Sequence, residues 1–232
     1  MMMLKNGGNM QEQFVLEEMI QNLLKVDDMT WGLYAFSRDV LKERIPVNKR
    51  LEMIKKAVTC GREYAEHVIH KYETSDVSII AEKLKLKVRM QDERITGKRI
   101  LFACYTPPNE IEIMTEPVEK ATKQILDVEP TLVEYFEKNS IMNTILGHEI
   151  FHYIEDKFEQ EIYTRTEKIL LWNFLGLKNF STIRALGEIG AMAFTKELNG
   201  LKYSPFILDI LLYYAYDSFS AEKIYHDVLE MS

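Results

Sequence analysis

Residues 145–156 read ILGHEIFHYIED and contain two histidines four residues apart, with a glutamate directly after the first. On an α-helix, positions i and i+4 share one face, with their Cβ atoms about 5 to 6 Å apart. The imidazoles of His148 and His152 can therefore meet at one metal ion, at the ~2.0 to 2.1 Å that a zinc–nitrogen bond requires. Glu149 lies ~100° around the helix, where it can hold a water molecule that the ion also holds.

The motif HExxH is a specific signal in a chain of this composition. A shuffled chain with the same five histidines would contain it roughly 0.01 times. The opposite face of the expected helix carries Leu146, Ile150 and Ile154, so one side packs and the other is polar. A structural alternative to metal binding stays open, in which the two histidines only form hydrogen bonds in a polar contact between helices.

A catalytic zinc site needs three protein ligands and one open position. Glu155 shares the face of His152 but lies about 10 Å along the helix axis from His148, too far to bind the same ion. We therefore expect Glu155 either at the surface or in contact with a ligand without binding the metal itself. Glu188, in the stretch STIRALGEIGAMAFTKELNG at 181–200, is the preferred third ligand. Alternatively, Glu188 is a solvated charge on a helix whose small residues serve packing alone. The small residues that would let this helix approach its neighbour are Ala185, Gly187, Gly190, Ala191 and Ala193.

Residues 74–200 resemble the ImmA/IrrE-type zinc metallopeptidases. In that family the HExxH helix is followed by a helix with the pattern E-x-x-A-x-x-F-x-x-E-L. The residues that fall on this pattern in register are Glu188, Ala191, Phe194, Glu197 and Leu198. The short helix in VSIIAEKLKLKV and the strands ending in EIEIMT also fit. Phe151 stands where the family usually has glycine, and Met192 where asparagine is common, but neither position supplies a ligand.

The resemblance implies a zincin-like core that hydrolyses peptide bonds, in a regulatory protein such as a repressor. His148, His152 and Glu188 would bind one Zn²⁺, and Glu149 would accept the proton of the attacking water. The expected partner is thus a protein or peptide substrate. A donor to the oxyanion is also expected, and the candidates are Tyr153, Tyr163, Tyr203 and Arg184.

Helical periodicity dominates the rest of the chain and predicts an α+β, mostly helical fold. Alternating runs at 87–92, 99–106 and 110–115 predict a small antiparallel sheet of about three strands, packed against the HExxH helix. The last run, EIEIMT, could form an edge strand with which an extended substrate pairs. Helices are expected at 118–127, 131–138, 140–157, 160–174, 181–198, 205–216 and 219–230.

The chain is expected to be one globular unit of three segments. Residues 1–73 would form an N-terminal helical segment, residues 74–200 the metallopeptidase core, and residues 201–232 C-terminal helices packed on that core.

Composition argues against several other classes of protein. The net charge is −7 and no stripe of Lys and Arg occurs, so no direct nucleic-acid partner is expected. No signal-peptide pattern and no run of ~20 apolar residues occurs, so we expect a cytoplasmic protein without a membrane partner. The two cysteines, Cys60 and Cys104, are far apart and argue against a disulfide framework.

Three rival interpretations remain open. Cys104 could supply the third ligand in a deformylase-like site, although the surrounding signature is absent. A di-iron bundle would need a second ExxH, which the chain lacks. The third rival is not an enzyme: the chain could be a non-catalytic, metal-binding helical protein with a regulatory or interaction role.

His67 and His70 could also form a second metal site, but their spacing on a charged helix is more typical of surface residues.

Overall fold

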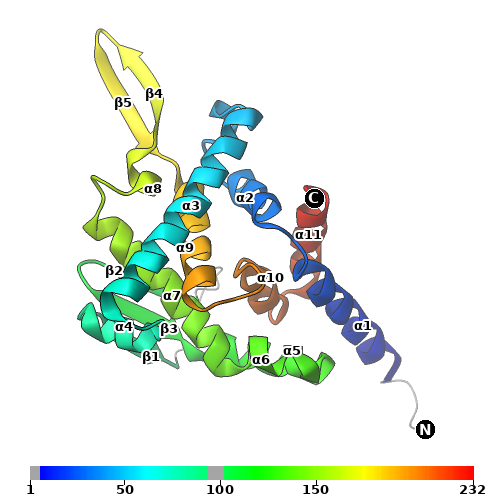
Figure 1. Ribbon diagram of the computed structural model, residues 1–232. Helices are drawn as coiled ribbons and strands as arrows, with labels where there is room; N and C mark the ends of the chain where they lie inside the picture. Colours follow the sequence, from blue (N-terminus) through cyan, green and yellow to red (C-terminus); the bar gives the residue numbers. More distant parts are fainter. Residues whose placement is uncertain (1–5, 93–101) are drawn as a thin grey trace.

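The computed structural model describes residues 6–92 and 102–232, which form a mostly helical α+β fold with a small sheet, as predicted (Figure 1). The N-terminal elements are α1 (Asn6–Leu23), α2 (Asp28–Ser37), the 3₁₀ turn η1 (Lys42–Arg44), α3 (Val47–Tyr72) and α4 (Val77–Lys83). The middle of the chain forms β1 (Lys87–Gln91), β2 (Ala103–Thr106), β3 (Glu110–Met114), α5 (Thr115–Val128), η2 (Pro130–Leu132), α6 (Val133–Phe136) and α7 (Lys138–Lys157). The remaining elements are α8 (Tyr163–Thr166), β4 (Lys168–Phe174), β5 (Leu177–Thr182), α9 (Arg184–Leu198), α10 (Ile207–Tyr214) and α11 (Ser218–Leu229).

Helix α9 lies at the centre of the fold and packs against both α3 and α7 (Figure 1). The crossing of α3 and α9 is very close, because a Cβ atom at Gly61 would come within 2.2 Å of the carbonyl oxygen of Gly190. Only glycine permits backbones to approach to this distance. The N-terminal helices are therefore packed directly onto the helix that carries Glu188.

Acidic N-cap residues fix where α2 and α4 begin. The side chain of Asp76 accepts hydrogen bonds from the backbone N–H groups of Ser78 and Ile79, at 2.8 and 3.1 Å. Asp27 caps α2 in the same way. Each bond satisfies a donor that a helix cannot pair internally.

The three-stranded sheet differs from the prediction in its pairing. Its order is β1-β3-β2, and β1 runs parallel to β3 while β2 runs antiparallel to it, so the sheet is mixed. The expected edge strand EIEIMT is instead the central strand β3, where Ile111 and Ile113 are fully buried. Alternating apolar residues indicate which face of a strand is buried but do not fix its neighbours. The expected strand at 99–106 begins outside the described residues, and its described part is β2.

The short helix α8 and the first strand of a β-hairpin replace the single helix expected at 160–174. Strands β4 and β5 pair antiparallel and project from the body of the molecule (Figure 1). Their turn is made by Leu175 and Gly176, both with positive φ, of 48° and 83°, as in the two-residue turns typical of hairpins. The helical prediction failed because the run ILLW at 169–172 has no helical period, and a short apolar run fits either structure.

The described parts of all three expected segments contribute to one buried hydrophobic cluster, which includes Leu16, Phe194 and Val228. The cluster places α7, α9 and the sheet in a common core with the N-terminal and C-terminal helices. In the described ranges, no helix combines the length and the apolar character needed to cross a membrane.

Candidate metal centre

The two histidines of the HExxH motif lie on one face of α7, with their rings turned towards each other. Their Nε2 atoms are 2.9 Å apart, and the ring centroids are separated by 4.6 Å. Both side chains are largely buried, with 16% of His148 and 20% of His152 exposed. Two nitrogen lone pairs can thus be directed at one point beside the helix, as the i and i+4 spacing predicted.

Glu188 reaches this point from α9. Its Oε2 atom is 3.4 Å from Nε2 of His148, and the ligand atoms of the three residues all lie within 4.8 Å of one another. Bonds of ~2.0 to 2.1 Å at tetrahedral angles would place zinc ligands about 3.3 Å apart. The separations of 2.9 and 3.4 Å are close to that value and the third pair lies within 4.8 Å, so small side-chain movements would let His148, His152 and Glu188 hold a zinc ion.

Small residues let α9 approach α7, as expected from the sequence. A Cβ atom at Gly187 would lie 3.1 Å from Oε1 of Glu155, and one at Gly190 would lie 2.8 Å from the ring of Phe151. Phe151 is fully buried and its ring also packs against Phe194. The side chain that departs from the family pattern is therefore accommodated by a glycine on the neighbouring helix.

The charges of His148 and Glu188 stabilise each other. Burial lowers the pKa of His148, but the hydrogen bond and the negative charge of Glu188 outweigh this effect and raise that pKa to about 9. Burial raises the pKa of Glu188, whereas His148, His152 and Arg184 together hold it well below its usual range. The carboxylate is thus ionised over the neutral pH range, as a metal ligand must be.

Glu149 lies beside the three candidate ligands and is buried, with 8% of its surface exposed. Its Oε2 atom accepts a hydrogen bond of 2.7 Å from the backbone N–H of Tyr105 in β2. This contact ties the edge strand of the sheet to the HExxH helix. A carboxylate has two oxygens, and the second oxygen of Glu149 can accept a proton.

Glu155 contacts the imidazole of His152 at the nitrogen that faces away from His148. It is almost fully buried, with 1% exposed, so the expectation of a surface position is wrong and the alternative, contact with a candidate ligand, is confirmed. Its Oε2 atom lies 2.9 Å from Nδ1 of His152 and 3.3 Å from Nη2 of Arg165, while Oε1 accepts a hydrogen bond from Thr164. Thr164 and Arg165 were not predicted from the sequence, because only the tertiary fold brings their side chains to Glu155.

Two small cavities flank the cluster. One has a volume of about 180 Å³ and is mostly apolar, with His148, Glu149 and Met192 in its wall. The other, which we call the polar cavity, has a volume of about 190 Å³ and is lined mostly by polar and charged residues, among them His152, Glu188 and Arg184. The cluster can therefore be approached from two sides, one that suits apolar groups and one that suits charged groups.

Asp209 of α10 lines the apolar cavity and was not singled out in the sequence. Burial raises the pKa of Asp209 to about 6, although the guanidinium of Arg38, at 3.6 Å, acts in the opposite direction. A second missed residue is Asp39, whose buried carboxylate accepts a 2.9 Å hydrogen bond from the backbone N–H of Ala185. This bond anchors the first turn of α9 and hence the position of Glu188.

The four candidate donors to an oxyanion lie in different places. Arg184 lines the polar cavity beside the cluster. Tyr153 packs edge-on against Tyr105, with 6.1 Å between ring centroids. Tyr203 is buried and donates a hydrogen bond to the carbonyl of Tyr135, and the hydroxyl of Tyr163 is buried near α3. Of the four, only Arg184 shares a described cavity with the candidate ligands.

The other candidate metal ligands lie apart from the cluster. Sγ of Cys104 contacts the carbonyl of Tyr105 and the hydroxyl of Thr106, and the one cluster of potential ligands found in the described residues does not include it. His67 and His70 are exposed on α3 and do not join the cluster either.

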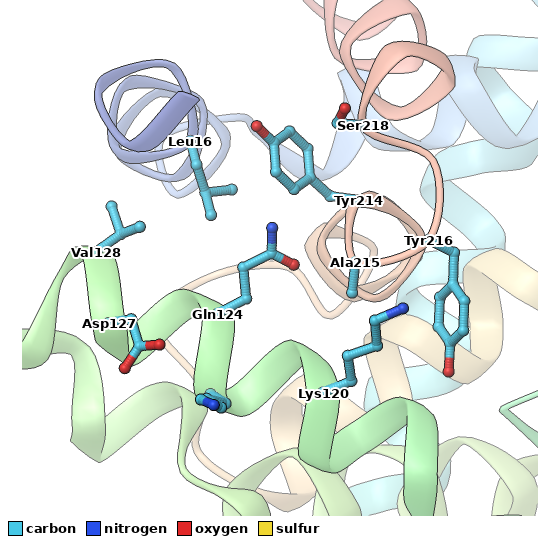
Figure 2. Close-up of a pocket in the computed structure, with 10 residues that line it drawn as sticks. Leu16, Lys120, Gln124, Asp127, Val128, Tyr214, Ala215, Tyr216 and Ser218 are labelled. Carbon is cyan, nitrogen blue, oxygen red and sulfur yellow. The ribbon is translucent and has the colours of Figure 1, made fainter. Parts of the chain in front are cut away.

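A larger cavity of about 550 Å³ lies elsewhere, between α1, α5 and the turn from α10 to α11 (Figure 2). Its wall includes Lys120, whose Nζ atom lies 3.9 Å above the ring of Tyr216. None of the candidate ligands and neither Glu149 nor Arg184 lines this cavity. Size alone therefore does not identify the functional site.

Comparison of the chain with models of protein families, with curated proteins and with solved structures finds no match.

Proposed function

We propose that the protein is a zinc-dependent metallopeptidase of the ImmA/IrrE type that hydrolyses peptide bonds in a protein substrate, such as a transcriptional repressor. The observation that carries this proposal is the convergence of His148, His152 and Glu188 from two helices, with the carboxylate of Glu149 beside them. Three protein ligands with room for a fourth are typical of catalytic zinc. We also propose a cytosolic location, where the free thiols of Cys60 and Cys104 would stay reduced.

A zinc ion bound at this cluster would supply a Lewis acid and lower the pKa of a water molecule to about 7. Glu149 would accept the proton of the attacking water and later deliver it to the leaving amine. Its hydrogen bond to the backbone of Tyr105 orients one carboxylate oxygen and leaves the other for this transfer. Arg184, in the polar cavity, would donate to the carbonyl oxygen as negative charge develops on it.

An extended substrate would bind along β2. This strand, and not β3 as expected from the sequence, is at the edge of the described sheet next to Glu149. Backbone pairing with an edge strand holds a peptide without reading much of its sequence. The apolar cavity lined by Met192 and Leu208 would then accept an apolar side chain of the substrate.

The variant Glu149→Gln tests this function. It should retain one zinc ion per chain, measured by plasma emission, and lose at least about 100-fold in cleavage rate because the proton acceptor is gone. The assay would use fluorescein-labelled casein and any repressor encoded beside the gene. The matched control, Glu159→Gln, changes an exposed glutamate just after α7 and should cleave like the wild type.

Two outcomes would contradict the proposal. A wild-type protein that binds zinc but cleaves none of these substrates would favour the non-catalytic, metal-binding regulatory protein. Equal cleavage by wild type and Glu149→Gln would assign the activity to other residues.

A further inference from the structure

The β4–β5 hairpin projects from the body of the molecule (Figure 1) and carries an unusual share of the exposed apolar side chains. Among the described residues, six of the twelve exposed large hydrophobic side chains lie on this one element. These six are Leu170, Trp172, Phe174, Leu175, Leu177 and Phe180. Contiguous apolar surface on a projecting element is typical of an interaction site, whereas single exposed apolar residues are ordinary.

The apolar side chains are ordered along the hairpin. Phe174 pairs with Leu177 directly beside the turn, and alternation places Trp172 on the same face. Leu175 is at the tip and is 89% exposed. Lys178 follows Leu177 and therefore points to the opposite face. The distal half is thus apolar at its tip and along one face, with a lysine on the other.

The turn itself contains an apolar residue in a conformation that does not favour it. Leu175 has a φ of 48°, in the left-handed region where glycine, asparagine and aspartate are preferred. Because the side chain is 89% exposed, packing within the chain does not offset this strain. A strained apolar residue at the tip points to a contact outside the chain.

The hairpin and the rest of the chain carry opposite charge. Between residues 168 and 182 the charged residues are Lys168 and Lys178, and Arg44 adds a further positive charge by donating to the carbonyl of Leu171. Because the hairpin contributes +2 to a net charge of −7, the remainder carries −9. The hairpin is therefore a cationic, apolar projection on an acidic body, and its charge complements an anionic surface.

We propose that the distal half of the hairpin is a peripheral membrane anchor that inserts into the interface of a bilayer containing anionic lipids. Three residues separate the tip from Trp172, which is about 10 Å at ~3.3 Å per residue. Apolar groups of interfacial anchors are buried ~5–10 Å deep. Phe174, Leu175 and Leu177 then enter the acyl boundary, while Trp172 and Lys178 lie at the level of the headgroups.

The length of the hairpin suits this role. Strand β4 has seven residues and spans about 23 Å at ~3.3 Å per residue. That length holds the acidic body beyond the Debye length of ~8 to 10 Å, so its repulsion from an anionic membrane is screened. This proposal departs from the expectation of no membrane partner, which rested on the lack of a spanning segment; a surface anchor does not need one. The anchor is also independent of the proposed peptidase activity.

Vesicle flotation tests the anchor with the full-length protein. The wild type should float with vesicles of phosphatidylcholine and phosphatidylglycerol at 7:3, and its bound fraction should fall at least about five-fold with pure phosphatidylcholine or in 1 M salt. Tryptophan emission should shift to shorter wavelength on binding. Trp31 is fully buried in the core, so this shift reports Trp172, which is half exposed, and should vanish in Trp172→Phe.

The variant Leu175→Asn separates binding from folding. Asparagine suits the turn, so thermal stability should stay the same or rise, while vesicle affinity should fall about ten-fold because the deepest apolar group is lost. The triple variant Phe174→Ser, Leu175→Asn, Leu177→Thr should not float at all. The matched controls are Val40→Ser and Phe219→Ser, which remove side chains that are 85% and 80% exposed elsewhere and should bind like the wild type.

Three outcomes would overturn the proposal. In the first, the wild type stays out of the anionic vesicle fraction even at 20 mM salt. In the second, the controls at Val40 and Phe219 lose as much binding as Leu175→Asn. In the third, sedimentation equilibrium finds a dimer that the triple variant makes monomeric, with no vesicle binding by either, which would assign the hairpin to self-association.

Discussion

The Oε2 atom of Glu155 lies 2.9 Å from Nδ1 of His152, on the opposite side of the ring from the nitrogen that faces His148. When Nδ1 donates its proton to this carboxylate, Nε2 is left with the lone pair that a metal requires. Thr164 and Arg165 in turn hold the carboxylate in place. The orientation of one candidate ligand therefore depends on a chain of contacts that reaches α8.

Replacing Glu155 with glutamine should weaken zinc binding about 10- to 100-fold, because the imidazole of His152 loses its charged hydrogen-bond acceptor. Competition with a chromophoric chelator would measure the affinity. The control Glu161→Gln changes an exposed glutamate near by and should bind zinc like the wild type. Equal affinity in Glu155→Gln, with the fold intact by circular dichroism, would show that the contact does not orient the ligand.

Zinc affinity should rise about ten-fold per pH unit from pH 6.5 towards pH 9. The pKa of His148 is about 9 in the metal-free protein, so binding below that pH must release the proton of the imidazolium. In Glu188→Gln the main cause of the raised pKa is removed while burial still lowers it, so the rise should level off at or below the ordinary histidine pKa of about 6.5. An identical pH slope in both proteins would contradict the coupling of His148 with Glu188.

If Arg184 donates to the oxyanion, Arg184→Gln should lower kcat about 100-fold or more and leave the zinc content unchanged. Arg184→Lys keeps the charge and should recover part of the rate. Arg89→Gln is the control, because Arg89 is an exposed arginine on β1, away from the cavity. A loss of zinc from Arg184→Gln would instead assign the arginine to holding Glu188 in place.

The variant Gly61→Ala should lower the free energy of unfolding by about 1–3 kcal/mol or more, measured by urea denaturation, because the new methyl group would overlap a backbone carbonyl that cannot rotate away. Gly147→Ala is the matched control, since its methyl group would first meet Thr195 at 3.3 Å. The control should have a much smaller effect. Equal stability of both variants would mean that α3 and α9 can separate at little cost.

The local part of the site was predictable from the sequence. The helical spacing of His148 and His152 fixes their relation whatever surrounds them, and the pattern around Glu188 predicted a carboxylate on a second helix, which lies within 4.8 Å of the pair. Glu149 was likewise expected beside the pair and lies there. These are features that a helix determines within one or two turns.

Local sequence patterns did not predict the order of the strands or the β4–β5 hairpin. They also did not predict the residues that hold the candidate ligands in position. The burial of β3 between two neighbours depends on the tertiary fold, and EIEIMT has the same alternation at an edge or at the centre. Asp39 reaches the backbone of Ala185 across 146 residues of sequence. No pattern within either segment reveals such a bond.

The contact of α3 with α9 at Gly61 and Gly190 joins two backbones, with no side chain between them that could yield. We therefore expect a movement of α3 to carry α9 with it. Glu188 is on α9, whereas both histidines are on α7. A displacement of α3 relative to α7 would therefore move Glu188 towards or away from the two histidines.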